Sequence, residues 1–221
     1  MARLKQMKTI YCISGLGADE RAFSRLEIDG YKITCLPWLT PLPKETIVNY
    51  AKRMSEDIKE KNPVLMGLSF GGMMCIEIAK HLPVEKVILI SSIKSVNELP
   101  AWMKAAGMLK LNRIFPMRTS KFTEAIQNRN LGISSPEEIE LVRFYRLNTP
   151  QQYLEWAINE VLNWRNNWYP PQVYHVHGDA DRLFPIRKVS PTHIIKGGGH
   201  FMIMNRAAEV NKALREILMV Q

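Results

Sequence analysis

A serine in a glycine-rich segment is the first candidate for chemistry in this 221-residue chain. The segment, residues 67–71, reads Gly-Leu-Ser-Phe-Gly, and it stands between an apolar run and an apolar pattern with helical spacing. A Gly-x-Ser-x-Gly pattern in that context predicts a tight strand-to-helix turn, in which the small residues make room for a strained serine backbone. The serine oxygen is then exposed beside a helix N-terminus, which stabilises negative charge. Ser69 is therefore a candidate nucleophile.

A base must accompany that nucleophile, because a serine hydroxyl reacts well only when a neighbouring histidine removes its proton. Of the five histidines, His200 alone follows a loop, KGGGH, that starts where the last expected strand ends. His81 closes the helix after Ser69, and the other three lie inside strand candidates. We predict that His200 is the base, the alternative being a loop histidine that caps a helix.

An acid that orients the histidine has two candidates. The segment HGDADRLFP offers Asp179 and Asp181 just beyond the end of the preceding strand. Either could instead be a turn residue, since Gly-Asp and Asp-Arg are common in turns. The residues by themselves leave both aspartates open.

The same segment also begins like a zinc signature. His175, His177 and Asp179 have the spacing His-x-His-x-Asp, but Ala180 stands where that signature requires a further histidine. Both histidines also read as alternate residues of one strand, whereas a zinc site would need ligands from loops. We expect neither a metal nor another cofactor.

Six apolar runs are typical of buried strands, and they alternate with helical patterns. The strands are expected at 8–14, 31–38, 62–69, 85–93, 171–178 and 191–198, and the helices at 44–61, 70–82 and 206–219. This alternation predicts an α/β fold with a mostly parallel sheet covered by helices on both faces. The carboxyl ends of its strands meet at one edge, where such sheets bind ligands.

The region 95–168 interrupts this rhythm. It has no convincing strand, and helices are expected near 100–112, 119–128, 136–147 and 150–164. Ser135 and Thr149 each begin a capping-box pattern with proline at the first helical position. We therefore predict an all-helical lid at 95–168, inserted into a core formed by residues 1–94 and 169–221.

These motifs together resemble the α/β-hydrolase fold enzymes, in which nucleophile, acid and histidine follow in that order. The resemblance covers nearly the whole chain, and the order here is Ser69, an aspartate, then His200. The acid loop of that family commonly reads His-Gly, two variable residues, Asp, and a proline four residues further on. The matching residues are His177, Gly178, Asp181 and Pro185. The resemblance thus selects Asp181 over Asp179.

The resemblance also implies an oxyanion hole made by two backbone N–H groups. One belongs to the residue after the nucleophile, Phe70, and the other to Leu16, in the loop Ser-Gly-Leu-Gly after the first strand. Many family members have His-Gly in that loop. Two departures are expected: the two N-terminal antiparallel strands of the family have no room, which leaves about six strands, and the helix between Asp181 and His200 is reduced to a turn or two.

The function implied is that of a serine hydrolase, with a carboxylic ester of small or medium size as substrate and an acyl-enzyme as intermediate. An alternative is a thioesterase, methyl-ester hydrolase or acyltransferase that acts on acyl groups held by an anionic carrier. It is suggested by basic residues in the first half of the lid, namely Lys104, Lys110, Arg113, Arg118, Lys121 and Arg129. A binding protein with an unused triad is a third alternative.

Composition limits the partners and the compartment. Although 30 Lys and Arg against 21 Asp and Glu give a net charge of +9, no nucleic-acid-binding pattern is present. Cys12, Cys35 and Cys75 each lie in a stretch that reads as core, so we expect buried thiols in a reducing compartment. Without a secretory signal or an apolar run of membrane-spanning length, a soluble cytoplasmic protein is expected.

Overall fold

One six-stranded sheet forms the centre of the protein. The structure is a computed structural model that describes residues 7–110 and 121–220. The strand order is β2-β1-β3-β4-β5-β6, and every neighbouring pair is parallel. The strands are β1 (Lys8–Ile13), β2 (Tyr31–Cys35), β3 (Val64–Leu68), β4 (Lys86–Ile90), β5 (Val173–Gly178) and β6 (His193–Ile195). The six predicted strands and their parallel arrangement are confirmed.

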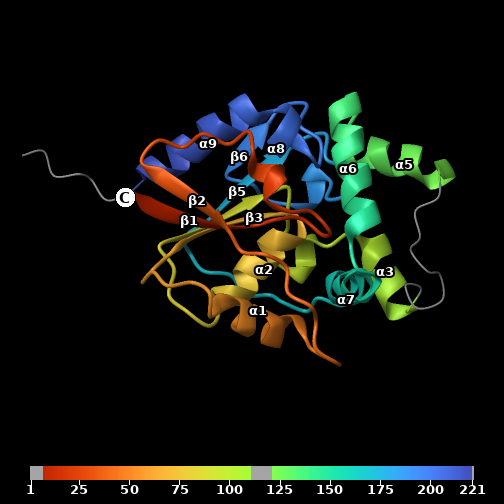
Figure 1. The fold of residues 1–221 in the computed structure, drawn as a ribbon, viewed down its shortest axis with the longest axis horizontal. Helices are drawn as coiled ribbons and strands as arrows, with labels where there is room; N and C mark the ends of the chain where they lie inside the picture. The colour runs from red at the N-terminus through yellow and green to blue at the C-terminus, as the bar shows by residue number, and fades with distance from the viewer. Residues whose placement is uncertain (1–6, 111–120, 221) are drawn as a thin grey trace, which may run out of the picture.

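Helices cover both faces of the sheet (Figure 1). On one face lie α1 (Ile47–Ser55) and α2 (Phe70–Ile78), and on the other lie α8 (Met202–Asn205) and α9 (Ala207–Met219). Each face has its own apolar cluster. All residues of β3 and β4 are buried, which explains why their sequences are continuously apolar instead of alternating.

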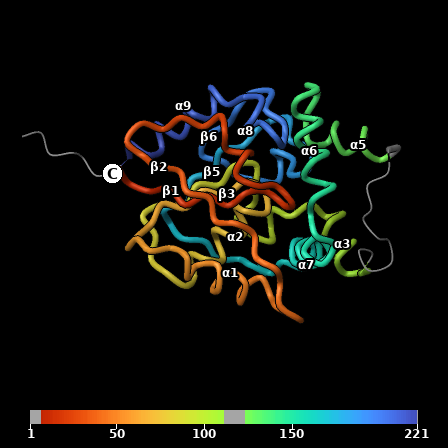
Figure 2. The backbone as a smooth tube through the Cα atoms, in the orientation of Figure 1, coloured from red at the N-terminus to blue at the C-terminus, as the bar shows by residue number. Residues whose placement is uncertain are grey.

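The segment between β4 and β5 contains helices joined by loops, and no strand, in its described residues. Its α-helices are α3 (Ala101–Met108), α5 (Lys121–Leu131), α6 (Pro136–Asn148) and α7 (Gln151–Leu162). They gather at one end of the sheet, on the right in Figures 1 and 2. The predicted helices at 100–112 and 119–128 each extend into residues 111–120, which lie outside the described part of the chain.

The two predicted capping boxes have different outcomes. Ser135 accepts a hydrogen bond from the Glu138 amide, and the Glu138 side chain accepts one from the Ser135 amide, so the first box is confirmed. The prediction for Thr149 is wrong, because α7 begins after Pro150 without a side-chain cap. The Thr149 hydroxyl instead donates to the Tyr145 carbonyl at 2.6 Å, at the end of the preceding helix.

The cysteines differ from expectation as well. Cys12 and Cys35 form a disulfide, and only Cys75 is a buried thiol. The two bonded cysteines lie opposite each other in the register of β1 and β2, with their Cα atoms 4.5 Å apart, a spacing that a disulfide can bridge. The expectation of three buried thiols, on which the reducing compartment depended, is therefore wrong. No helix within the described residues has both the length and the apolar character needed to cross a membrane.

The disulfide should stabilise the protein measurably. It joins residues 23 positions apart, and a loop of that size should contribute about 3 kcal/mol to the free energy of unfolding. We expect urea unfolding with dithiothreitol to give a value lower by about that amount than unfolding without it. Cys35→Ser should have the lower stability in both conditions. Three reactive thiols in the oxidised, urea-unfolded wild-type protein would contradict the bond.

Candidate active site

The backbone at Ser69 has an unusual conformation. Ser69 joins β3 directly to α2, with φ of 52° and ψ of −118°. A serine in this region is strained, and the strain must be offset by its surroundings. The chain segments around it approach so closely that a Cβ on Gly67 would collide with the Gly71 backbone, and one on Gly71 would collide with the Ile13 carbonyl. The flanking glycines thus supply the space that the turn needs.

The end of β4 holds this turn in place. The Ser69 amide donates to the Ile90 carbonyl at 2.9 Å, and the Ser92 hydroxyl donates to the Ser69 carbonyl at 2.6 Å. Ser92 is fully buried. Sequence reasoning missed this residue, although the pair Ser91-Ser92 at the end of the apolar strand 85–93 was a visible signal. Both backbone polar groups of Ser69 are therefore satisfied by the last residue of β4 and the segment directly after it.

Three predicted side chains lie in one hydrogen-bonded line. The Ser69 Oγ is 2.8 Å from Nε2 of His200, and Nδ1 of His200 is 2.8 Å from Oδ2 of Asp181. An ionised carboxylate can only accept a hydrogen bond, so Nδ1 carries the hydrogen and Nε2 presents its lone pair to the Ser69 hydroxyl. Asp181 and His200 are each 4% exposed. This arrangement can take the proton from the Ser69 hydroxyl.

Asp181, not Asp179, is the carboxylate that contacts His200. Its second oxygen, Oδ1, accepts from the amides of Leu183 and Phe184 at 2.8 and 2.9 Å. Burial tends to raise the pKa of Asp181, but its interactions with His200 and His177 and the hydrogen bond from the Phe184 amide together hold that pKa below its usual value. Asp179 turns elsewhere and accepts from the Gly197 amide at 2.6 Å. Asp181 can therefore remain ionised beside the imidazole.

Two backbone amides are available beside Ser69. Leu16 lies in the loop after β1, where the neighbouring Gly15 approaches Ser69 so closely that an added Cβ would lie 3.7 Å from the Ser69 Cβ. Phe70 is the first residue of α2, a position whose amide has no acceptor within its own helix. In the described part of the chain, neither amide donates to any protein acceptor. The sequence prediction named both residues.

Two histidines of β5, His175 and His177, form a buried pair next to the Asp181 loop. The His177 Nε2 is 2.7 Å from the Phe184 carbonyl, which can only accept, so this nitrogen carries the hydrogen. Its Nδ1 then accepts from Nε2 of His175 at 3.0 Å. Both rings are fully buried and alternate along one strand, as predicted. Within residues 7–110 and 121–220, no group of three or more His, Cys, Asp or Glu could hold a metal ion.

The histidine pair should make stability depend on pH. Burial is the main cause that places the pKa of His175 well below its usual value, and electrostatic repulsion by the neighbouring His177 and Lys94 would further disfavour a proton on it. Burial also lowers the pKa of His177. The unfolded chain therefore binds more protons below about pH 6.5, and stability must fall as the pH falls. We expect His175→Gln to reduce the slope of unfolding free energy against pH by about 1.4 kcal/mol per unit between pH 6.5 and 5.

The matched control for that experiment is His81→Gln, because His81 is exposed at the end of α2. This control should leave the slope of the wild-type protein unchanged. Denaturant titrations at four or five pH values measure all three slopes. Equal slopes for the wild-type protein and His175→Gln would contradict the assignment of a neutral buried ring.

The helical insertion contacts all three loops of the site. The Phe201 amide, next to His200, donates to the Leu131 carbonyl at 2.9 Å. Arg182, next to Asp181, donates to the Arg129 carbonyl at 3.2 Å. On the opposite side, the Thr149 hydroxyl is 3.3 Å from the carbonyl of Gly17, in the loop after β1. The insertion therefore packs against the ends of β1, β5 and β6.

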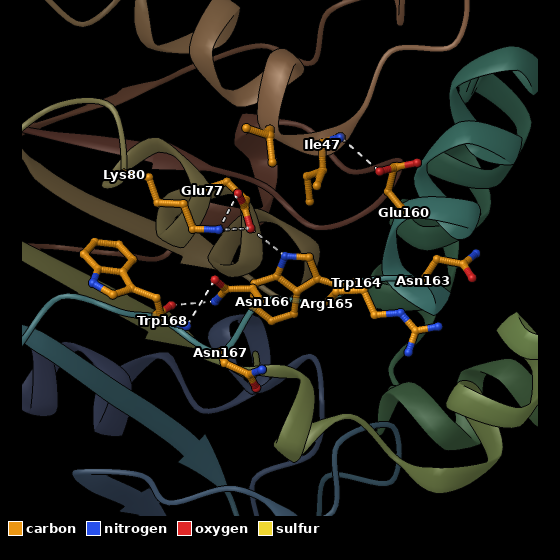
Figure 3. A pocket seen from close by; sticks show the side chains of 11 residues that line it. Ile47, Glu77, Lys80, Glu160, Asn163, Trp164, Arg165, Asn166, Asn167 and Trp168 are labelled. Carbon is orange, nitrogen blue, oxygen red and sulfur yellow. Dashed lines mark hydrogen bonds and ion pairs between the residues drawn. The ribbon is translucent and has the colours of Figure 1, made fainter.

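An open pocket of about 690 Å³ lies elsewhere, between α1, the end of α2 and residues 160–168 (Figure 3). Ser69, Asp181 and His200 do not line it. In this pocket the buried carboxylate of Glu77 accepts from the Trp164 indole nitrogen at 2.7 Å and from the Lys80 ammonium at 2.8 Å. Glu77 thus ties the helix that follows Ser69 to the end of the insertion.

Comparisons with known proteins agree with this fold. The esterase from Thermogutta terrifontis is 17% identical, with a TM-score of 0.72 over 96% of this chain and 89% of that chain. MenH from S. aureus is 16% identical, with a TM-score of 0.74 over 98% and 95%. The bromoperoxidase from Bacillus anthracis is 17% identical, with a TM-score of 0.71 over 96% and 91%. At these identities the likeness concerns the fold alone. No curated protein matches the sequence.

The family model described as "Alpha/beta hydrolase family" matches residues 15–213. The match spans the Ser69 turn, the Asp181 loop, His200 and the whole helical insertion. Because it includes most of the chain, we conclude that the protein belongs to the alpha/beta hydrolase family.

Proposed function

We propose that the protein is a serine hydrolase that cleaves carboxylic esters through an acyl-enzyme. One observation carries the proposal: Ser69 Oγ, His200 and Asp181 are joined by two hydrogen bonds of 2.8 Å each. A serine, a histidine and a buried carboxylate in this order have the geometry of nucleophile, general base and orienting acid. The strained turn that exposes the Ser69 oxygen beside a helix N-terminus adds independent support.

The chemistry follows from the hydrogen-bond directions. The Ser69 oxygen attacks the acyl carbon while His200 Nε2 takes the serine proton, and the amides of Phe70 and Leu16 stabilise the oxyanion. The carbon–oxygen bond to the alcohol then breaks, and the alcohol leaves with the proton from His200. Water then attacks the acyl-enzyme while His200 takes its proton, the bond between the acyl carbon and Ser69 Oγ breaks, and the carboxylic acid leaves as His200 returns the proton to Ser69. Asp181 stays ionised throughout, because its role is to orient the imidazole and stabilise its positive charge.

We infer further that residues 95–168 act as a lid. The insertion contacts the loops that carry His200, Asp181 and Leu16, so its position can govern access to Ser69. The names of solved structures with this fold include an esterase, a bromoperoxidase and an epoxide hydrolase. The choice of an ester as substrate therefore rests on the serine and histidine of this chain, not on the fold.

The purified protein should hydrolyse p-nitrophenyl acetate or butyrate. Ser69→Ala should lower kcat at least a hundredfold, because it removes the oxygen that forms the acyl-enzyme. A fluorophosphonate probe should label the wild-type protein at Ser69 and leave the variant unlabelled, which intact-protein mass spectrometry can measure. Equal hydrolysis by the two proteins would exclude this mechanism, and absence of both labelling and hydrolysis in the wild-type protein would favour a binding role.

A second candidate function has its own observation. Arg182 and Arg129 are both exposed, and the Arg182 guanidinium donates to the Arg129 carbonyl, right beside the Asp181 loop. Neither guanidinium forms an ion pair with a carboxylate in the part of the chain that the structure describes. Two unpaired positive charges near the site favour a thioesterase, methyl-ester hydrolase or acyltransferase that acts on an acyl group held by an anionic carrier. Of the other basic residues in this region, Arg113 and Arg118 lie outside the described residues.

Salt dependence separates the two candidates. Attraction between the arginine pair and an anionic thioester should be screened by salt, so kcat/KM should fall between 10 and 150 mM salt (on the order of tenfold). Arg129→Gln combined with Arg182→Gln should remove most of that dependence. Arg215→Gln on α9 is the control, and it should behave as the wild-type protein does. A flat salt response of the wild-type enzyme would rule out the carrier, without affecting ester hydrolysis.

A further inference from the structure

The indole of Trp38 lies against the loop that supplies one of the two oxyanion amides. Trp38 follows β2, and its Nε1–H donates to the Gly15 carbonyl at 3.2 Å and to the Ser14 hydroxyl at 3.0 Å. The Ser14 hydroxyl in turn donates to the Ala18 carbonyl at 2.6 Å, so it presents a lone pair to the indole. The Ala18 amide also donates to the Gly15 carbonyl, at 3.0 Å. The Gly15 oxygen is thus held by two donors, the Trp38 indole and the Ala18 amide.

Holding that oxygen fixes the Leu16 amide, because both groups belong to one peptide unit. A peptide unit is planar and trans, so its C=O and N–H point in opposite directions. Once the Gly15 oxygen is bound on the side of Trp38, the Leu16 N–H must point away from the indole. It has no protein acceptor among the described residues, and its loop approaches Ser69 at Gly15. The indole therefore controls the direction of a free donor beside the nucleophile.

Trp38 also contacts the second oxyanion residue. Its ring stacks on that of Phe70, with the centroids 5.1 Å apart and the planes at 11°. The stack joins the loop after β2 to the first residue of α2. Tyr153, from α7 of the insertion, also packs against the indole, with the ring centroids 5.3 Å apart. One half-buried side chain thus links both amide donors to the lid.

We propose that Trp38 is a positioning residue for the oxyanion hole, acting through its indole N–H on the Gly15–Leu16 peptide unit. The proposal rests on the proposed function, since it assumes that Ser69 forms a tetrahedral oxyanion. Loss of one oxyanion donor typically lowers kcat by about a hundred- to a thousandfold. Loss of its orientation alone should have a smaller effect, so we expect Trp38→Phe to lower kcat about 10- to 100-fold while KM changes less than threefold.

Trp156→Phe is the matched control. Trp156 is also half-buried, stacks on Tyr50 in the same aromatic cluster, and donates its indole N–H to a backbone carbonyl, that of Glu45, at 2.7 Å. It makes no hydrogen bond to the loop after β1 in the described structure. Trp156→Phe should therefore lose about as much packing as Trp38→Phe and one indole hydrogen bond. It should nevertheless leave kcat within about threefold of the wild-type value.

The decisive readout is binding of a trifluoromethyl ketone, which adds to the Ser69 oxygen and forms an oxyanion without a leaving group. In Trp38→Phe its affinity should fall by the same factor as kcat/KM, whereas a merely structural defect would not produce this match. Replacing Trp38 with 3-benzothienylalanine, in which sulfur takes the place of the indole N–H, should reproduce the effect with the ring shape retained. This second variant keeps the test valid if Trp38→Phe folds poorly.

The outcomes separate the inference from the function on which it rests. A tenfold or larger loss in both Trp38 variants, with Trp156→Phe near wild type, supports the role of Trp38. If Ser69 is labelled and active but the Trp38 and Trp156 variants lose activity equally, or none does, the role of Trp38 is wrong while the hydrolase assignment stands. If the wild-type protein neither hydrolyses esters nor reacts with the fluorophosphonate, the proposed function itself fails.

Discussion

The strained backbone of Ser69 is the constraint on which the rest of the site depends. A serine at φ 52° is unfavourable by itself and persists only where its surroundings over-determine it. Here the neighbouring strand binds its amide through Ile90 and its carbonyl through Ser92, while the glycines on either side let β1 and α2 approach within contact distance. In this conformation the side chain of Ser69 points toward His200, and α2 begins at the next residue, Phe70. A sheet packed less closely at this point could not hold the same turn.

The parallel sheet then explains how groups far apart in the sequence meet at this turn. Ser69 follows β3, Asp181 follows β5 and His200 follows β6, and all three strands end at the same edge of the sheet. Only one turn of 3-10 helix, Ile186–Lys188, lies between the Asp181 loop and β6, so the link from Asp181 to His200 is short. The His175–His177 pair fills the interior behind Asp181 with uncharged rings, and one of them binds the Phe184 carbonyl of the acid loop. The buried carboxylate thus keeps its charge because of the hydrogen bonds it accepts and the imidazole it faces.

The sequence predicted those features that depend on neighbouring residues along the chain. Each strand was visible as an apolar run, and the Ser69, Asp181 and His200 motifs each sit within a few residues of a strand end, so their placement needed only the strand order of a parallel sheet. Features that depend on lateral pairing were missed. The disulfide requires Cys12 and Cys35 to be opposite in register, and no local pattern reveals that β2 pairs with β1. The sequence predicts Trp38 as the end of a strand, because its partner Gly15 lies in another segment of the chain. It predicts Thr149 as a helix cap, because the alternative acceptor, the Tyr145 carbonyl, belongs to the preceding helix.

The position of β2 explains why so many bonds converge on its end. In the described sheet β2 is an edge strand, paired only with β1, so the chain that leaves it has no second strand to hold it. Three connections hold this segment instead. They are the Cys12–Cys35 disulfide, the hydrogen bond of 2.8 Å from the Leu36 amide to the Cys12 carbonyl, and the hydrogen bonds from the Trp38 indole to Ser14 and Gly15. Each of them joins the exit of β2 to the exit of β1, the loop that carries the Leu16 amide. Although β2 has no outer neighbour in the described sheet, the loop of Leu16 is therefore held in place by cross-links between the ends of two strands.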